Sequence, residues 1–182
     1  WTAAQVKAAM VNSASRDAAK LTANTRITGN GLVQPNAAIG NGVLIYPSTI
    51  VADGDTGLSY GVREEASVST KRQITVANLS GSSQTIAMSA MFEGAPAGAT
   101  MTFNKDSITL GAGKSTLVTA TLNLSAEYMA GRGTSSSTIK TLYGQVIATR
   151  GDGKVSTLPF NAVPASRSAV SAKRVGNDLQ LK

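Results

Sequence analysis

The sequence contains no cysteine and no histidine, and each absence excludes a class of chemistry. Without cysteine, the chain can form neither a disulfide nor a thiolate metal site, and cysteine content does not decide the redox compartment. Without histidine, the chain by itself cannot assemble a Ser-His-Asp triad or an imidazole-ligated metal site. We predict no catalytic residue, no cofactor-binding residue, no metal ligand and no cofactor, although these two absences do not exclude a carboxylate calcium site.

Aromatic residues and long apolar runs are also scarce. Aromatics make up 4% of the chain against 42% for all apolar residues, so the core must consist mainly of Val, Ile, Leu, Ala and Met. No apolar run approaches the roughly eighteen residues of a membrane-spanning helix, so no transmembrane segment is predicted. The chain also begins without an initiator Met or a signal-peptide pattern, and we expect a piece of a longer protein or a processed product.

The net charge of +7 is concentrated at the two ends of the chain. Residues 1–40 and residues 166–182 each carry a net charge of +3, whereas the middle is nearly neutral. A nucleic-acid-binding domain usually has a basic face with aromatic or arginine stacking platforms, and neither is evident here. The sequence therefore predicts no nucleic-acid partner.

The first fourteen residues, WTAAQVKAAMVNSA, have the pattern of a well-defined helix. Thr2 is the predicted N-cap, Gln5 completes a capping box, and Trp1 and Val6 stand where a hydrophobic staple would form. Apolar residues recur at spacings of three and four along this segment: Val6, Ala9, Met10 and Ala14. A helix of this length is marginal alone, so its apolar stripe must be covered by another surface.

The remaining sequence changes from loop to strand patterns. The stretch GNGLVQPNAAIGNG predicts a loop with an apolar pair, Leu32 and Val33, and a brief helical turn at 36–39, while 43–50 has the pattern of an extended segment. From residue 58 the apolar period becomes two, and about seven short strands are separated by Gly, Pro and Ser turns. The longest alternation comprises Val118, Ala120, Leu122 and Leu124. We predict a mainly β fold, an antiparallel sandwich, with a Gly-Asp-Gly hairpin at 151–153 and no parallel pairing, because no helical crossover separates the strands.

Two motifs are typical of ligand sites but lack essential residues. LGAGKST at 110–116 has Ile108 where a phosphate-binding loop needs glycine, and a strand follows where that loop needs a helix; we predict a hairpin turn with a solvated lysine. Asp53, Asp55 and Glu64 stand at three EF-hand positions, but Leu58 occupies the position that requires glycine. Ordinary turn chemistry explains the aspartates, and a surface calcium site using them stays open.

Two further motifs have simpler explanations. Arg150–Asp152 forms an RGD tripeptide at the expected hairpin tip, where Asp-Gly is also the commonest turn dipeptide, and we favour the turn. The segment 131–138 holds Gly133-Thr134-Ser135, and Ser137 lies three residues before Lys140, as in nucleophile motifs. No helical pattern fixes either serine, so we expect a surface loop.

The order of the segments resembles that of subtilisin-like serine proteases. WTAAQVKAAMVNSA followed by GNGLVQPNAAI resembles the C-terminal end of their catalytic domain. Residues 58–165, with TVANLS at 75–80, look like the fibronectin type III-like module that follows in many large secreted members. The resemblance implies four regions: 1–40 as a catalytic-domain remnant, 41–57 as a linker, 58–165 as a fibronectin type III-like sandwich, and 166–182 as a tail or the start of a further region.

The resemblance implies a non-catalytic C-terminal accessory portion of a secreted subtilisin-like serine endopeptidase. The family's catalytic Asp, His and Ser lie upstream of the segment matched by Trp1, so no catalytic residue carries over to this chain. The sandwich would position or stabilise the protease, with the upstream catalytic domain as partner, a protein as substrate of the parent, and a secreted or cell-surface location. The apolar stripe of the helix would rest on the protease domain, unless it rests on the sandwich.

Two alternatives stay open from the residues themselves. The chain could be a free-standing binding module that recognises a surface polymer or a protein through loops 131–138 or 149–154, with Tyr128 and Tyr143 as surface aromatics. It could also be a spacer in a cell-surface array, its basic tail leading into the next unit.

Overall fold

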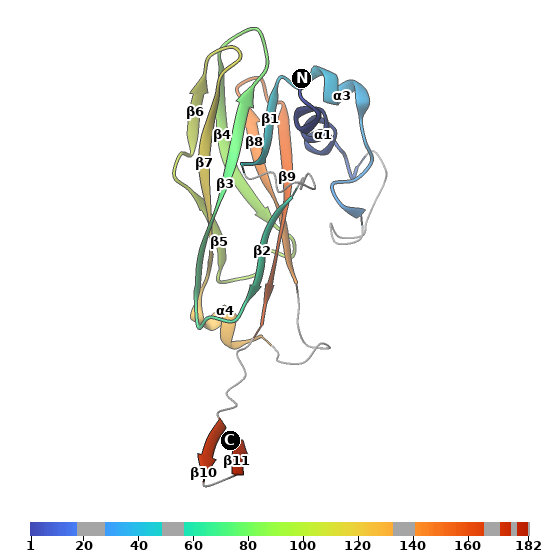
Figure 1. Ribbon diagram of the computed structural model, residues 1–182. Helices are drawn as coiled ribbons and strands as arrows, with labels where there is room; N and C mark the ends of the chain where they lie inside the picture. Colours follow the sequence, from blue (N-terminus) through green and yellow to red (C-terminus); the bar gives the residue numbers. More distant parts are fainter. Residues whose placement is uncertain (18–27, 49–56, 133–140, 166–171, 176–177, 182) are drawn as a thin grey trace.

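The computed structural model describes residues 1–17, 28–48, 57–132, 141–165, 172–175 and 178–181. Two β-sheets form a sandwich, and the N-terminal helices lie beside one end of it (Figure 1). The predicted fold class, a mainly β, fibronectin type III-like sandwich preceded by a short helix, is confirmed.

The strands divide between two main sheets and one separate pair. The four-stranded sheet has the order β1 (Val43–Pro47), β3 (Val68–Asn78), β7 (Ser115–Leu124), β5 (Ala99–Phe103). The five-stranded sheet has the order β2 (Leu58–Arg63), β9 (Val155–Pro164), β8 (Leu142–Arg150), β4 (Gln84–Phe92), β6 (Ser107–Leu110). β10 (Ala172–Val175) pairs with β11 (Asp178–Leu181), and the helices are α1 (Ala3–Asn12), α3 (Pro35–Gly40) and α4 (Ala126–Ala130).

The main core lies between the two sheets and follows the alternation seen in the sequence. In β7 the four alternating apolar side chains are all buried: Val118, Ala120, Leu122 and Leu124. Tyr60 of β2 and Phe160 of β9 meet edge to face with their ring centroids 6.4 Å apart. Few aromatics are needed because aliphatic side chains from both sheets fill the rest of this layer.

One pair of strands is parallel, contrary to the sequence-based expectation. β2 runs parallel to β9, with Leu58 opposite Phe160, and the register shifts between Ser59 and Val62, where Gly61 has φ +69°. The expectation was wrong because a parallel pair needs a long connection but not a helical one. Here the connection between β2 and β9 passes through all the intervening strands of the sandwich.

The turn between β6 and β7 joins the two sheets and is not the predicted hairpin. β6 pairs with β4, whereas β7 pairs with β3 and β5. The buried Asn78 side chain fixes this turn, since its Nδ2 donates to the carbonyl oxygens of Leu110 (2.9 Å) and Gly111 (3.0 Å). A strand follows Lys114 where a phosphate-binding loop would need a helix.

The hairpin predicted at Gly-Asp-Gly is confirmed. β8 and β9 pair antiparallel on either side of it, and the Arg150 N–H donates to the Lys154 carbonyl at 2.9 Å. Gly153 adopts φ +82°, a conformation that glycine tolerates without strain from a Cβ.

The predicted helix forms, but it packs with a different face. The capping box is present: Gln5 N–H donates to Thr2 Oγ1 at 3.2 Å and Thr2 N–H donates to Gln5 Oε1 at 2.8 Å. Val6 and Met10 of the predicted stripe remain 45% and 42% exposed. Ala9 of that stripe is buried, and the other buried side chains of α1 are Ala8 and Asn12. The short helix expected at 36–39 is also found, as α3.

α1 and α3 rest on β1, which lies within residues 41–57. β1 is buried on both faces: Val43 and Ile45 join the main core, while Leu44, with no exposed surface, joins a second cluster with Ala8, Ala9 and Ala38. Small alanines let the helices approach the strand closely. The surface that covers α1 is therefore part of this chain.

Candidate binding surface beside the N-terminal helices

Side chains from the N-terminal segment occupy the free edge of β1. The Asn12 amide donates from Nδ2 to Ile45 O at 2.9 Å and accepts at Oδ1 from Ile45 N–H at 2.8 Å. At Val43, the N–H donates to Asn41 Oδ1 at 3.3 Å, and the carbonyl accepts from Ser156 Oγ at 2.7 Å. Backbone groups that would be open at this sheet edge are therefore bonded to side chains.

The neighbouring edge of β9 is occupied in the same manner. The Thr157 carbonyl accepts hydrogen bonds from Asn12 Nδ2 at 2.9 Å and from Asn30 Nδ2 at 3.2 Å. Asn30 is held in turn by Gln145, whose Nε2 donates to Asn30 Oδ1 at 2.9 Å. These amides lie along a cleft of about 880 Å³ between the N-terminal segment and the five-stranded sheet. Many polar groups of the cleft bond to one another, so we interpret it as a structural junction between the N-terminal segment and the sheet and not as a ligand site. We call it the junction.

An ion pair closes one side of the junction. Arg16 Nη1 lies 2.8 Å from Glu93 Oε1, and the two side chains are only 23% and 18% exposed. The pair connects the segment after α1 to the end of β4. Together with the amide network, it fastens residues 1–17 and 28–40 to the sandwich.

A group of exposed apolar side chains lies on the opposite side of α1 from this junction. We call it the N-terminal apolar surface: Trp1, Val6, Met10, Val33, Pro35 and Ile39. Trp1 is 60% exposed and Ile39 is 77% exposed. With Ala9 and Ala38 these side chains line a groove of about 250 Å³ between α1 and α3, and every lining side chain is apolar.

This concentration of exposed apolar residues is unusual within the molecule. Among the described residues ten large hydrophobic side chains are exposed, and six of them belong to residues 1–39. The other four come from four different strands: Val62, Met91, Leu117 and Val155. Contiguous exposed apolar patches on soluble proteins commonly mark interaction sites, whereas scattered ones do not.

The structure shows no chemistry that would make this surface an active site. The groove lining contains no titratable side chain. Within the described part of the chain there is no group of three or more Asp, Glu, His or Cys residues that could hold a metal. Asp53 and Asp55 lie outside the described residues, and Glu64 is exposed just after β2.

The aromatic residues proposed for a surface patch do not form one. Tyr128 is buried beneath the Arg132 guanidinium, whose central carbon lies 3.9 Å from the ring centroid, and burial raises the pKa of the Tyr128 hydroxyl. Tyr143 is half-buried in β8. Gly133-Thr134-Ser135, Ser137 and Lys140 lie outside the described residues.

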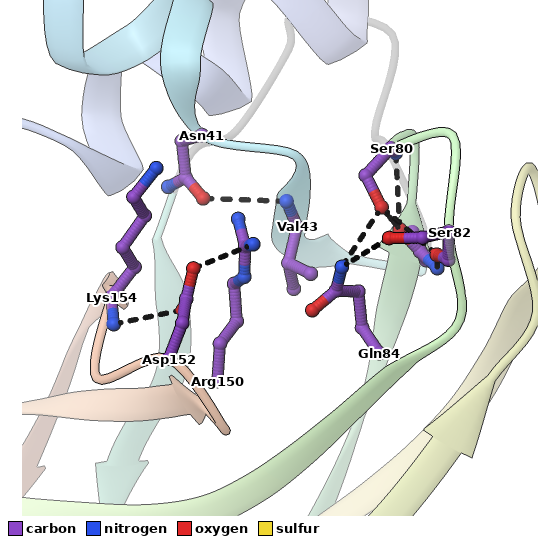
Figure 2. A network of polar contacts seen from close by, with 9 residues as sticks. Asn41, Val43, Ser80, Ser82, Gln84, Arg150, Asp152 and Lys154 are labelled. Atoms are coloured by element: carbon purple, nitrogen blue, oxygen red, sulfur yellow. Dashed lines mark hydrogen bonds and ion pairs between the residues drawn. The ribbon is translucent and has the colours of Figure 1, made fainter.

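The RGD tripeptide is folded back on itself at the hairpin tip (Figure 2). Arg150 Nη2 donates to Asp152 Oδ2 at 2.9 Å, and the Arg150 side chain is only 10% exposed. Asp152 Oδ1 also accepts from the Lys154 N–H at 3.2 Å. Beside this hairpin, Gln84 Nε2 donates to Ser80 Oγ and Ser82 Oγ, which tightens the turn between β3 and β4. An adhesion ligand must present its arginine to solvent, and this arginine is turned inward.

Sequence reasoning identified the apolar residues but not the surface that they form. The helix pattern marked Val6 and Met10 as a core-facing stripe, and Val33 was seen only as part of an isolated apolar pair. What brings them together is the packing of α3 against α1 over Leu44.

No helix among the described residues has the length and apolar character needed to span a bilayer. Comparison with protein-family models gave no match, and comparison with curated proteins gave none either. Solved structures with a similar arrangement include a FixG-related protein from Vibrio parahaemolyticus, at 9% identity and a TM-score of 0.43, covering 67% of this chain and 94% of that one.

Two chaperones are similar to a comparable degree. The periplasmic chaperone SfaE matches at 12% identity and a TM-score of 0.42, covering 70% of this chain and 58% of that one. The Escherichia coli chaperone DraB matches at 15% identity and a TM-score of 0.38, covering 70% of this chain and 66% of that one.

The predicted relationship to subtilisin-like proteases is contradicted by these findings. Neither the FixG-related protein nor the two chaperones is named as such a protease, and no family model or curated protein connects the chain to one. The accessory role beside a serine endopeptidase and the partnership with an upstream catalytic domain are contradicted with it. The physical reason is local. The described parts of residues 1–40, the segment interpreted as a remnant of another domain, are built into this sandwich through the hydrogen bonds of Asn12 and Asn30 and through packing against Leu44 of β1.

Proposed function

We propose that this chain is a non-catalytic binding module that engages a protein partner through the N-terminal apolar surface. The observation that carries the proposal is the gathering of five exposed side chains around one groove: Trp1, Val6, Met10, Val33 and Ile39. Ala8 and Asn12 of the same helix are already buried against β1. Burial of apolar area on a partner would contribute about 25 cal/mol per Å² before the costs of association. A location outside the cytoplasm, secreted or at the cell surface, stays part of the proposal.

The chemistry of the groove favours a protein over a small molecule or a polar polymer. Its volume of about 250 Å³ is below the usual range of small-molecule pockets, roughly 300–1,000 Å³. Such pockets also use a few polar groups to orient a ligand, and none lines this groove. A protein segment that inserts apolar side chains into the groove can bind without polar groups in the groove lining.

Peptide selection tests this proposal even while the natural partner is unidentified. A displayed library of random peptides is selected on the folded chain, and each enriched peptide is then measured on two variants by calorimetry. The surface variant is Val6→Glu combined with Ile39→Glu, two changes at exposed positions. The control is Leu117→Glu combined with Val62→Glu, which places the same two charges at exposed residues of β7 and β2.

The proposal predicts enriched peptides that bind the control as they bind the wild type and bind the surface variant at least tenfold more weakly. Circular dichroism must show that both variants are folded. Enriched peptides that bind all three proteins equally, or a selection with no enrichment, would contradict the proposal.

A further inference from the structure

We infer that the partner segment is an amphipathic α-helix with acidic flanks, an inference that rests on the proposed function. The groove lies between two helices, α1 and α3, which contact each other and leave their apolar side chains facing outward. A third helix can place a row of side chains into the groove of a helix pair. Its apolar residues would follow the i, i+3, i+4, i+7 spacing.

The adjoining sheet edge does not offer the alternative of an added strand. An added strand needs free backbone N–H and C=O groups at a sheet edge. At β1 those of Val43 and Ile45 are bonded to Asn41, Ser156 and Asn12. Pro47, next in the alternation, has no N–H to donate. Recognition at this surface must therefore use side chains, as a helix does.

The charges around the groove favour an acidic helix over a basic one. Neither α1 nor α3 contains a carboxylate, and Lys7 is the single charged residue of the two helices. The chain as a whole carries +7. Acidic residues flanking the apolar row of a partner helix would therefore meet a complementary field, and basic residues would be repelled.

The size of the surface favours a helix from another protein over a second copy of this chain. A stable protein dimer buries about 800 Å² on each partner, contributed by about 20–30 residues a side. The N-terminal apolar surface consists of six residues. A single docked helix needs a smaller contact area and suits a groove of this extent.

Trp1 provides a direct measurement because it is the chain's single tryptophan and lies on the groove. Three synthetic tryptophan-free peptides of equal length are titrated against the folded chain. The first is an acidic amphipathic helix of Leu, Ala and Glu with helical spacing. The second has the same composition in strict alternation, and the third carries Lys in place of Glu.

The expected result is a saturable blue shift of Trp1 emission with the first peptide, with an affinity at least tenfold higher than for the other two. Val6→Glu with Ile39→Glu should abolish the shift, and the equally charged control, Leu117→Glu with Val62→Glu, should retain it. Equal binding of the alternating peptide, or stronger binding of the basic one, would overturn the inference.

Two further outcomes separate the inference from the proposed function. If none of the three peptides shifts Trp1 while library peptides still depend on the surface, the helical partner is wrong and the binding module stands. If sedimentation shows a dimer that the surface variant loses, the occupant is a second copy, and the inference is likewise overturned.

Discussion

The side-chain amide of Asn12 bonds to both backbone groups of Ile45, as a neighbouring strand would. Nδ2 lies 2.9 Å from Ile45 O, and Oδ1 lies 2.8 Å from Ile45 N, at a residue with no exposed surface. One residue at the end of α1 thereby joins the helix to the edge of β1. The same Nδ2 also reaches Thr157 O, so the two sheets are linked at this point.

Replacing Asn12 by alanine should destabilise the fold strongly. The substitution leaves the buried N–H and C=O of Ile45 without partners, and we expect the free energy of unfolding in urea to fall by about 2–4 kcal/mol. Asn36→Ala, at an exposed position of α3, is the matched control and should change it by less than about 0.5 kcal/mol. Equal stability of the two variants would show that Asn12 does not fasten the helix to the sheet.

Gly144 of β8 should tolerate no side chain. A Cβ at this position would overlap the Met91 carbonyl oxygen and the Phe160 ring. We expect Gly144→Ala to lower the free energy of unfolding by about 1–3 kcal/mol, because backbone and ring must both shift. At Gly111 the nearest atom to an added Cβ is Lys114 Cγ at 3.7 Å, an ordinary contact. Gly111→Ala should therefore melt close to the wild type, and a similar loss in both variants would be inconsistent with this packing.

Tyr60 should make the protein sensitive to alkaline pH. Its hydroxyl is buried and donates to Ala120 O at 3.2 Å, and burial raises its pKa above the ordinary value of 10.0. Above that pH the unfolded chain releases this proton while the folded chain retains it, so the stability contribution present at lower pH is lost as pH rises, by up to about 1.4 kcal/mol per pH unit.

Tyr60→Phe tests this account through unfolding measured at several pH values. The variant should lose about 1 kcal/mol at neutral pH, because the hydrogen bond to Ala120 O is gone. It should also show a shallower fall in stability above pH 10.0 than the wild type. Tyr143→Phe, a change at a half-buried ring, controls for the removal of one tyrosine. An unchanged alkaline slope in Tyr60→Phe would refute the assignment.

The RGD tripeptide should not act as an adhesion ligand. Because the Arg150 side chain is 10% exposed and bonded to Asp152, a receptor cannot engage both charges without opening the hairpin. Cells plated on the protein should attach equally to the wild type and to Asp152→Glu, and free RGD peptide should not compete. Attachment that is lost in Asp152→Glu and competed by the peptide would show that the hairpin opens.

Local patterns predicted the elements of this fold well. The capping box of Thr2 and Gln5, the alternation from Val118 to Leu124 and the Gly-Asp-Gly turn all depend on interactions between residues close in the chain. Each therefore leaves a readable pattern of fixed period or composition. The absence of histidine likewise excluded a catalytic triad within this chain without any coordinates.

Tertiary packing decided how those elements are used. Periodicity placed Val6, Ala9 and Met10 on one apolar stripe of α1, yet of these only Ala9 is buried, together with Ala8, because small side chains permit close approach to Leu44. No local pattern indicates that Asn12 would find Ile45, 33 residues away, or Thr157, 145 residues away. The sequence by itself thus determined most of the helices and strands, although α4 was not predicted. Only the folded chain decided which face of α1 is buried and which is left as a binding surface, because that choice depends on contacts between residues far apart in the sequence.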